Sequence, residues 1–130
     1  MRVALVDYDS GNLHSAEKAF VLMGRETGAE VVVTSDPDLV RAADRIVLPG
    51  DGAFPACRAA LDAVPGMVEV LRNLRARLII PMHYFNQFTL TRFVDRVKGE
   101  FPIEESTTNT IIVSQETLPP EPKVLILPGM

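Results

Sequence analysis

The sequence has little of several things that would narrow its function. A single cysteine, Cys57, means that no disulfide can form within the chain, and one unpaired thiol fits a reducing, cytoplasmic setting. No apolar run approaches the roughly 20 residues that a membrane-spanning helix needs. Asp7 and Asp9 interrupt the apolar start of the chain, so we expect no signal peptide there.

Positive charge and histidine are scarce as well. The 13 basic residues are outnumbered by 17 acidic ones, which gives a net charge of −4. Binding to nucleic acid or to a membrane surface rests on basic patches, so we expect neither partner. The only histidines are His14 and His83. A zinc site normally takes three or four protein ligands, and the sequence shows no cluster that would supply them.

What the sequence does have is an ordinary globular composition, 47% hydrophobic and 23% charged over 130 residues, which is enough for one domain. Through residues 1–74, short apolar runs alternate with segments in which apolar residues recur at helical spacing. We predict strands at residues 2–7, 31–33 and 45–48. We predict helices at residues 13–23, 54–63 and 67–74, and a short helix that begins near Asp36. Gly24 and Gly28 should end the first helix, and Ser35 should cap the short one. This alternation predicts an α/β fold with a parallel sheet.

The second part of the chain continues the alternation less regularly. We predict a strand at residues 78–80, a turn at 83–87, a helix that ends near Val97 and a polar connector at 101–109. Two further strands are predicted at residues 111–113 and 124–127, with a stiff proline-rich spacer between them. We expect this part to complete or extend the first sheet, so that residues 1–130 form a single α/β domain. Whether the last two strands join the sheet is left open.

The most informative stretch is residues 46–54, an apolar strand that runs into Pro49-Gly50-Asp51-Gly52 and then into a helix start. Ligands of parallel sheets bind beyond the carboxyl ends of the strands, which directs attention to the loops at residues 8–12 and 49–53. Backbone N–H groups beside a helix N-terminus can bind an anion. The alternative is an ordinary strand-to-helix turn. We interpret Cys57, which follows inside the helix, as a small packed or half-exposed residue.

Residues 1–74 resemble the start of a known family, the class I glutamine amidotransferase subunit of imidazole glycerol phosphate synthase, from histidine biosynthesis. The stretches that carry this resemblance are residues 3–8, 10–13, 33–37 and 44–54. It implies a flavodoxin-like parallel sheet, truncated here. It also implies that Gly50, Asp51 and Gly52 lie on the strand that helps form the oxyanion hole, although many members have an apolar residue where this chain has Asp51. Gly11 and Asn12 would face the cyclase subunit of the synthase.

The resemblance stops before the catalytic residues of that family. A member should continue into a Gly-x-Cys-x-Gly-x-Gln nucleophile elbow and later supply a His and a Glu. This chain has no cysteine after Cys57, and His83 falls about where the nucleophile should be. An imidazole cannot form the thioester that glutamine hydrolysis requires. We therefore expect no catalytic residues of this kind and no glutaminase activity, with glutamine bound only if a site survives.

From about residue 75 the sequence resembles a different family, the C-terminal end of a metallo-β-lactamase-fold hydrolase. Residues 76–84, 93–97 and 122–129 carry this second resemblance. It implies that His83 matches a metal ligand, but the upstream His-x-His-x-Asp-His motif that supplies the other ligands is missing. The chain thus looks like a fusion of two family fragments near residue 75.

Three functions follow from these observations. The first is an amidotransferase-like module that needs no cofactor and has the cyclase subunit as its partner. The second is a metal-dependent hydrolase, which would hold zinc at His83. The third is a non-enzymatic interaction module or an inert fusion product, in which the loop at Gly11 and Asn12 could still dock on the synthase.

Overall fold

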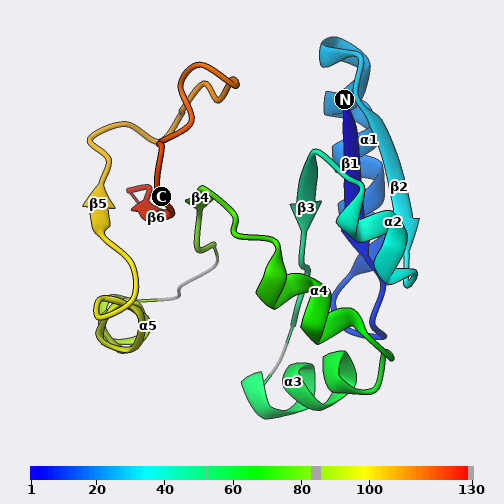
Figure 1. Cartoon of the computed structure of the whole chain (residues 1–130), viewed down its shortest axis with the longest axis horizontal. Coiled ribbons are helices and arrows are strands. Elements are labelled where there is room, and N and C mark those ends of the chain that lie inside the picture. Colours follow the sequence, from blue (N-terminus) through cyan, green and yellow to red (C-terminus); the bar gives the residue numbers. More distant parts are fainter. Residues whose placement is uncertain (52, 83–85, 129–130) are drawn as a thin grey trace. The chain divides into compact units, whose positions relative to one another are not determined.

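The computed structural model describes residues 1–51, 53–82 and 86–128 of the chain. It divides into two compact units, Met1–Leu74 and Arg75–Met130. Each unit has its own three-stranded parallel sheet with helices beside it (Figure 1). The predicted α/β class with parallel strands is confirmed, and the fold is consistent with the predicted flavodoxin-like arrangement. The division falls where the sequence analysis predicts that the resemblance changes family.

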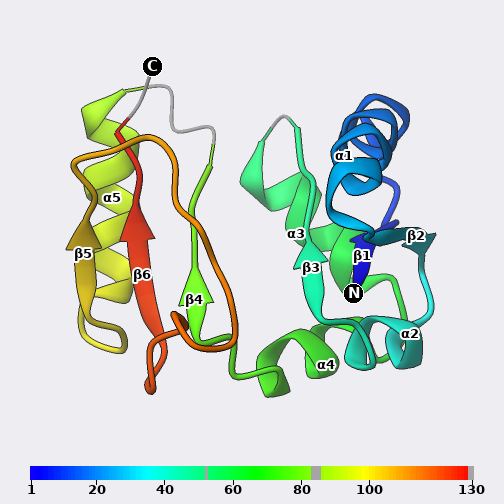
Figure 2. The ribbon, with the colours of Figure 1, turned by 90° about the horizontal axis from the view of Figure 1, so that it is seen from above.

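The first unit alternates strands and helices as predicted. In chain order its elements are β1 (Arg2–Val6), α1 (Leu13–Thr27), β2 (Glu30–Thr34), α2 (Pro37–Arg41), β3 (Arg45–Val47), α3 (Phe54–Asp62) and α4 (Met67–Asn73). The strands pair in the order β2-β1-β3, and Leu5 of the central strand lies opposite Val33 and Val47 (Figure 2). The carboxyl ends of β1 and β3 therefore lie next to each other.

Two helix boundaries differ from the prediction. Helix α1 continues through Gly24 and ends only at Gly28, whose φ of 69° is left-handed. Gly24 has a packing role instead, because a Cβ atom there would lie 2.9 Å from the carbonyl oxygen of Ala29. Helix α2 is capped by Asp36 and not by Ser35. The Asp36 side chain accepts a hydrogen bond from the Asp38 amide at 2.8 Å, so the cap lies one residue later than predicted.

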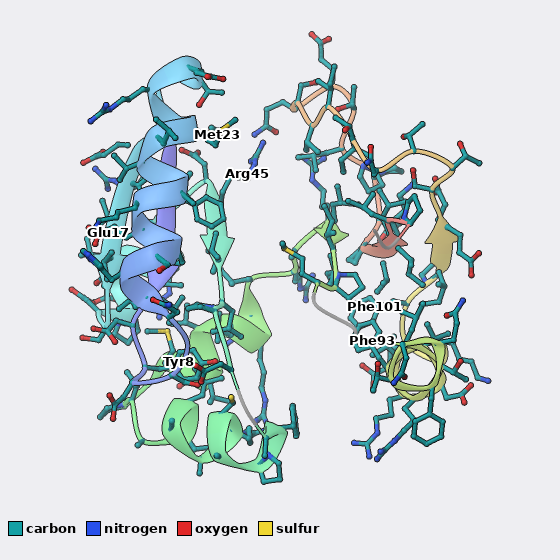
Figure 3. The ribbon with its side chains drawn as sticks, turned by 180° about the vertical axis from the view of Figure 1, so that it is seen from behind. Tyr8, Glu17, Met23, Arg45, Phe93 and Phe101 are labelled. Carbon is teal, nitrogen blue, oxygen red and sulfur yellow. The ribbon has the colours of Figure 1, made fainter. Side chains whose placement is uncertain are left out.

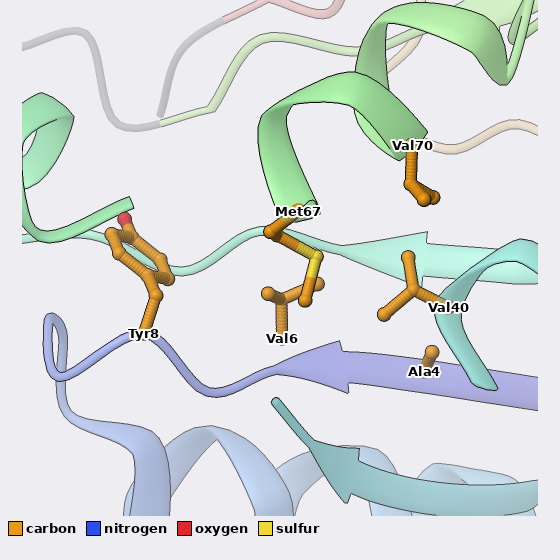
Figure 4. Close-up of a cluster of buried hydrophobic side chains, with 6 residues drawn as sticks. All are labelled: Ala4, Val6, Tyr8, Val40, Met67 and Val70. Carbon is orange, nitrogen blue, oxygen red and sulfur yellow. The ribbon is translucent and has the colours of Figure 1, made fainter. Parts of the chain in front are cut away.

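A cluster of buried side chains in the first unit lies on one face of β1, and Val3 and Leu5 are buried on the other face. Residues 4, 6 and 8 point to the same side of the strand because side chains alternate along it. Helices α2 and α4 cover this face (Figure 4). The buried cluster consists of Ala4, Val6, Tyr8, Val40, Met67 and Val70. Since Tyr8 closes this cluster just beyond the strand, the core reaches directly to the loop at the carboxyl end of the sheet.

The second unit contains β4 (Leu78–Ile79), α5 (Gln87–Val97), β5 (Ile103–Glu105) and β6 (Lys123–Ile126). Its strands pair in the order β4-β6-β5, all parallel. The expectation that these residues complete or extend the first sheet is wrong, because β4 pairs with β6 in a separate sheet. A small core joins Leu90 of α5 to the middle strand, and Phe93 and Phe101 pack against it (Figure 3).

Two predictions in the second unit are wrong as well. Residues 111–113 form no strand, and Ile112 is 87% exposed. The neighbouring Ser114 and Thr117 bond to each other in a local turn, with the Ser114 amide donating to Thr117 Oγ1 at 2.8 Å. The predicted polar connector at 101–109 contains β5, in which Ile103 lies opposite Val124 and packs on the small core. The last predicted strand is confirmed as β6, shifted by one residue.

None of the helices in the described part of the chain is long and apolar enough to cross a membrane.

Candidate functional site at the strand ends of the first unit

The two loops singled out from the sequence lie against each other. Gly11, in the loop after β1, has a φ of +88°, and a Cβ atom there would lie 3.0 Å from the Gly50 backbone nitrogen. The same atom would lie 3.1 Å from Cβ of Pro49. Both the backbone angle and the close approach therefore require glycine at position 11. The result is a close junction between the β1 exit and residues 49–51.

Tyr8 bonds the two loops together from the core side. The residue is only 5% exposed, and its hydroxyl donates a hydrogen bond to the Pro49 carbonyl oxygen. The hydroxyl also approaches Gly50 closely, since a Cβ atom at that position would lie 3.1 Å from it. Burial raises the pKa of the Tyr8 phenol; Cys57 and Asp51 add to the rise, whereas the hydrogen bond with Ser10 opposes it. Tyr8 is thus a neutral donor at physiological pH.

Cys57 connects the same loops to helix α3. It lies in the first turns of that helix and is partly buried, in agreement with the predicted packed or half-exposed position. Its Sγ donates to the Asp51 carbonyl oxygen at 3.0 Å and lies 3.1 Å from the Ser10 hydroxyl. Sequence reasoning missed this contact with the strand-end loops. A signal for it is the place of Cys57 in the first turns of the helix, from which a side chain can reach back to the preceding loop.

Asn12 has a structural role at the edge of this site. Its side-chain oxygen accepts a hydrogen bond from the Ser15 amide at 3.2 Å and so caps α1. The residue itself is exposed. Its position beside Gly11 leaves it accessible, and its predicted role in facing a partner subunit stays a prediction.

The Asp51 side chain takes no part in these hydrogen bonds. Asp51 is exposed, and its carbonyl is held by Cys57. Gly52 and His83 lie outside the described residues, so their roles on the oxyanion strand and at a metal stay predictions. Within residues 1–51, 53–82 and 86–128, no three His, Cys, Asp or Glu side chains come together as a metal site would require.

The chemistry that these contacts support is binding and orientation. The site presents a buried phenol, a hydroxyl, a thiol and the backbone of residues 49–51. Among the described residues, the Cys57 thiol has a hydroxyl and a peptide carbonyl as hydrogen-bond partners, and neither is a general base. Nucleophilic catalysis by a thiol requires an adjacent base or another means of activation. In the described part of the chain, the strand-end contacts therefore provide a positioned backbone segment, and no base contacts the Cys57 thiol.

Comparison with known proteins bears on the first unit. No protein-family model matches the chain. Its N-terminal segment is 67% identical over 72 residues to the imidazole glycerol phosphate synthase subunit HisH of Ruegeria pomeroyi, which covers 55% of this chain and 34% of the relative. The N-terminal segment is similar to HisH. The HisH subunit of Cereibacter sphaeroides is 60% identical over 82 residues, or 62% of this chain and 39% of the relative. The HisH subunit of Brucella suis is 59% identical over 75 residues, which cover 56% of this chain and 35% of the relative.

The chain spans about a third of the length of these curated relatives. The predicted resemblance of the N-terminal segment to the amidotransferase subunit is thereby confirmed. None of these relatives is a metallo-hydrolase, so the resemblance of residues 75–130 to that family stays a prediction.

Proposed function

We propose that this chain acts as a truncated amidotransferase subunit of imidazole glycerol phosphate synthase that docks on the cyclase subunit and releases no glutamate from glutamine. The observation that carries the proposal is the 67% identity of its N-terminal segment to HisH over 72 residues, close to the length of the first unit. The close approach of Gly11 to Gly50 supports it, because it places the predicted partner-facing loop beside residues 49–51.

The absence of glutaminase activity follows from the chemistry that hydrolysis of an amide needs. A thiolate must attack the glutamine amide, a base must activate it, and backbone donors must stabilise the oxyanion. The sequence offers one thiol, Cys57, and that thiol donates to a peptide carbonyl inside the strand-end loops. A chain of this kind retains the backbone part of the machinery without its nucleophile.

The activity that we propose for the chain is docking on the cyclase subunit. The loop at Gly11 and Asn12 is accessible at the carboxyl end of the sheet and is held rigidly by its contact with Gly50. A rigid, exposed loop loses little conformational freedom on binding, which favours its use as a contact surface.

Titration calorimetry of the full chain with the cyclase subunit tests this docking. The informative variant is Asn12→Ser, because serine keeps the helix cap of α1 and removes the larger amide from the proposed contact. Asn86→Ser is the matched control, since Asn86 caps α5 in the second unit in the same way. We expect binding by the wild-type chain, weaker binding by Asn12→Ser and unchanged binding by Asn86→Ser. No binding, or equal losses in both variants, would rule out docking through this loop.

For the second unit we propose no metal chemistry. The predicted hydrolase resemblance rests on His83 as one ligand, whereas catalytic zinc sites use three protein ligands. We infer that the chain joins two unrelated fragments near residue 75, and the division of the structure at Leu74 supports this.

A further inference from the structure

We propose that Tyr8 is a positioning residue that sets the orientation of the Pro49–Gly50 peptide and thereby the direction of the Gly50 N–H. The use of that N–H as an anion donor goes beyond the proposed function, which is docking without glutamine hydrolysis. The orientation itself rests only on contacts within the first unit.

A peptide group couples the directions of its two polar ends. The bond is planar and the described residues contain no cis peptide, so the carbonyl oxygen and the following N–H point in opposite directions. The Tyr8 hydroxyl donates to the Pro49 carbonyl oxygen. Holding this oxygen toward Tyr8 therefore turns the Gly50 N–H away from it.

Tyr8 can hold the peptide because its own position is fixed. The ring is part of the buried cluster with Val6 and Met67, and the side chain has few rotatable bonds (Figure 4). A hydrogen bond shielded from water is electrostatically stronger than an exposed one. Because the ring is fixed in the core, its hydroxyl is held at a fixed position beside the Pro49 carbonyl.

Two glycines make the arrangement sterically feasible. At Gly50, a Cβ atom would lie 3.1 Å from the Tyr8 hydroxyl, and at Gly11 it would lie 3.0 Å from the Gly50 nitrogen. The Pro49–Gly50 peptide is therefore confined between the phenol on one side and the Gly11 backbone on the other. From helix α3, the Cys57 thiol donates a hydrogen bond to the carbonyl oxygen of Asp51, two residues after Pro49.

A preoriented N–H needs no reorganisation when an anion or a developing oxyanion arrives, which is how such donors gain their effect. The simpler interpretation is that the phenol merely satisfies a buried polar group. The two interpretations differ in one respect. Loss of the hydroxyl alters the peptide orientation if Tyr8 is a positioning residue, and lowers only stability if it is not.

The sequence permits a selective spectroscopic test. Proline precedes glycine at three places, residues 49–50, 65–66 and 128–129. The full chain, labelled with ¹³C at proline carbonyls and ¹⁵N at glycine, should give one carbonyl-to-amide correlation for each pair. Pro65→Ala and Pro128→Ala each remove one correlation and so assign the third. The two other pairs are internal references for the fold of the chain.

We expect Tyr8→Phe to shift the Pro49–Gly50 correlation in both carbonyl and amide dimensions while the two reference correlations hold. Tyr84→Phe removes the other tyrosine hydroxyl of the chain and should leave the Pro49–Gly50 correlation in place. An unchanged Pro49–Gly50 correlation in Tyr8→Phe would overturn the proposal. A shift of all three correlations would overturn it too, because the effect would then be global.

A second measurement serves if Tyr8→Phe does not fold. In the Tyr84→Phe chain only Tyr8 ionises as a phenol, and a phenolate cannot donate to Pro49. The Pro49–Gly50 correlation should move in step with phenolate absorbance as the pH rises, also when Cys57→Ala removes the nearby thiol. Phenolate formation without that movement would refute the assignment. Neither experiment involves the cyclase subunit, so a failure of docking and a failure of Tyr8 positioning are separate results.

Discussion

Substituting Gly11 by alanine tests the strand-end junction directly. The substitution places a Cβ atom at a φ of +88° and at 3.0 Å from the Gly50 nitrogen. A non-glycine residue in the left-handed region costs about 1–2 kcal/mol of stability. Forcing an extra methyl group into a packed site costs about a further 1–3 kcal/mol. We therefore expect Gly11→Ala to destabilise the first unit by about 2–5 kcal/mol in all.

The chain offers two matched controls for this substitution. Gly28 has a similar φ of +69°, but a Cβ atom there would have no neighbour within 4 Å. Gly28→Ala should therefore show only the backbone cost, about 1–2 kcal/mol. Gly99 lies in the second unit, so Gly99→Ala should leave the free energy of unfolding of the first unit unchanged. The difference between the first two variants isolates the close contact with Gly50.

The assay must report the first unit by itself. A two-unit chain does not unfold as one two-state system, so whole-chain curves would mix the units. Urea unfolding followed through the amide signals of Val3 to Val6 in β1 reads the first unit, and the linear extrapolation gives its free energy. Equal losses in Gly11→Ala and Gly28→Ala would refute the close approach of the two loops.

Three further predictions concern the core, the phenol and the metal. Met67→Ala should destabilise the first unit by about 2–5 kcal/mol because Met67 is fully buried, whereas Met23→Ala, at a residue of the same unit that is 56% exposed, should be near neutral in the same urea assay. The raised pKa of Tyr8 means that the unfolded chain loses this proton first. The contribution of Tyr8 to the free energy of unfolding should be complete below the pKa of the phenol in the unfolded chain, and it should decline as the pH rises through the pKa in the folded chain. Tyr8→Phe should remove this decline in alkaline unfolding curves. The chain purified without chelator should hold less than stoichiometric zinc by elemental analysis, and His83→Ala should not change the zinc content; one zinc per chain lost in His83→Ala would revive the hydrolase interpretation.

Local signals explain why the first unit could be predicted almost completely. The apolar runs of β1, β2 and β3 are each bounded by polar or glycine-rich turns, and Asn12 and Asp36 cap the helices that follow. Each element could therefore be found without knowing its neighbours. The errors are of one or a few residues at helix ends, where Gly24 continues the helix because it packs on β2.

The second unit shows where local signals fail. Residues 103–105 have one apolar side chain and two carboxylates, yet they form β5 because β6 offers a pairing edge from far along the chain. Residues 111–113 have the composition of a strand, yet no described strand pairs with them, and Ile112 is exposed. Strand pairing depends on partners that composition does not reveal.

The candidate site, too, could be predicted only in part from the sequence. The rule that ligands bind at the carboxyl ends of parallel strands identified the two loops that meet. The contacts of Tyr8 with Pro49 and of Ser10 with Cys57 join residues 41 and 47 positions apart, and they depend on the packing of the core. A pattern of residue types could indicate the loops but not which side chains hold them.

Glutamate release from glutamine in the presence of excess cyclase subunit tests the central claim most directly. We predict a rate equal to that of the buffer blank for the wild-type chain and for Cys57→Ser alike, because the one thiol of the chain has no base among its hydrogen-bond partners in the described residues. Release above the blank by the wild-type chain, abolished in Cys57→Ser, would contradict this claim and identify Cys57 as a nucleophile.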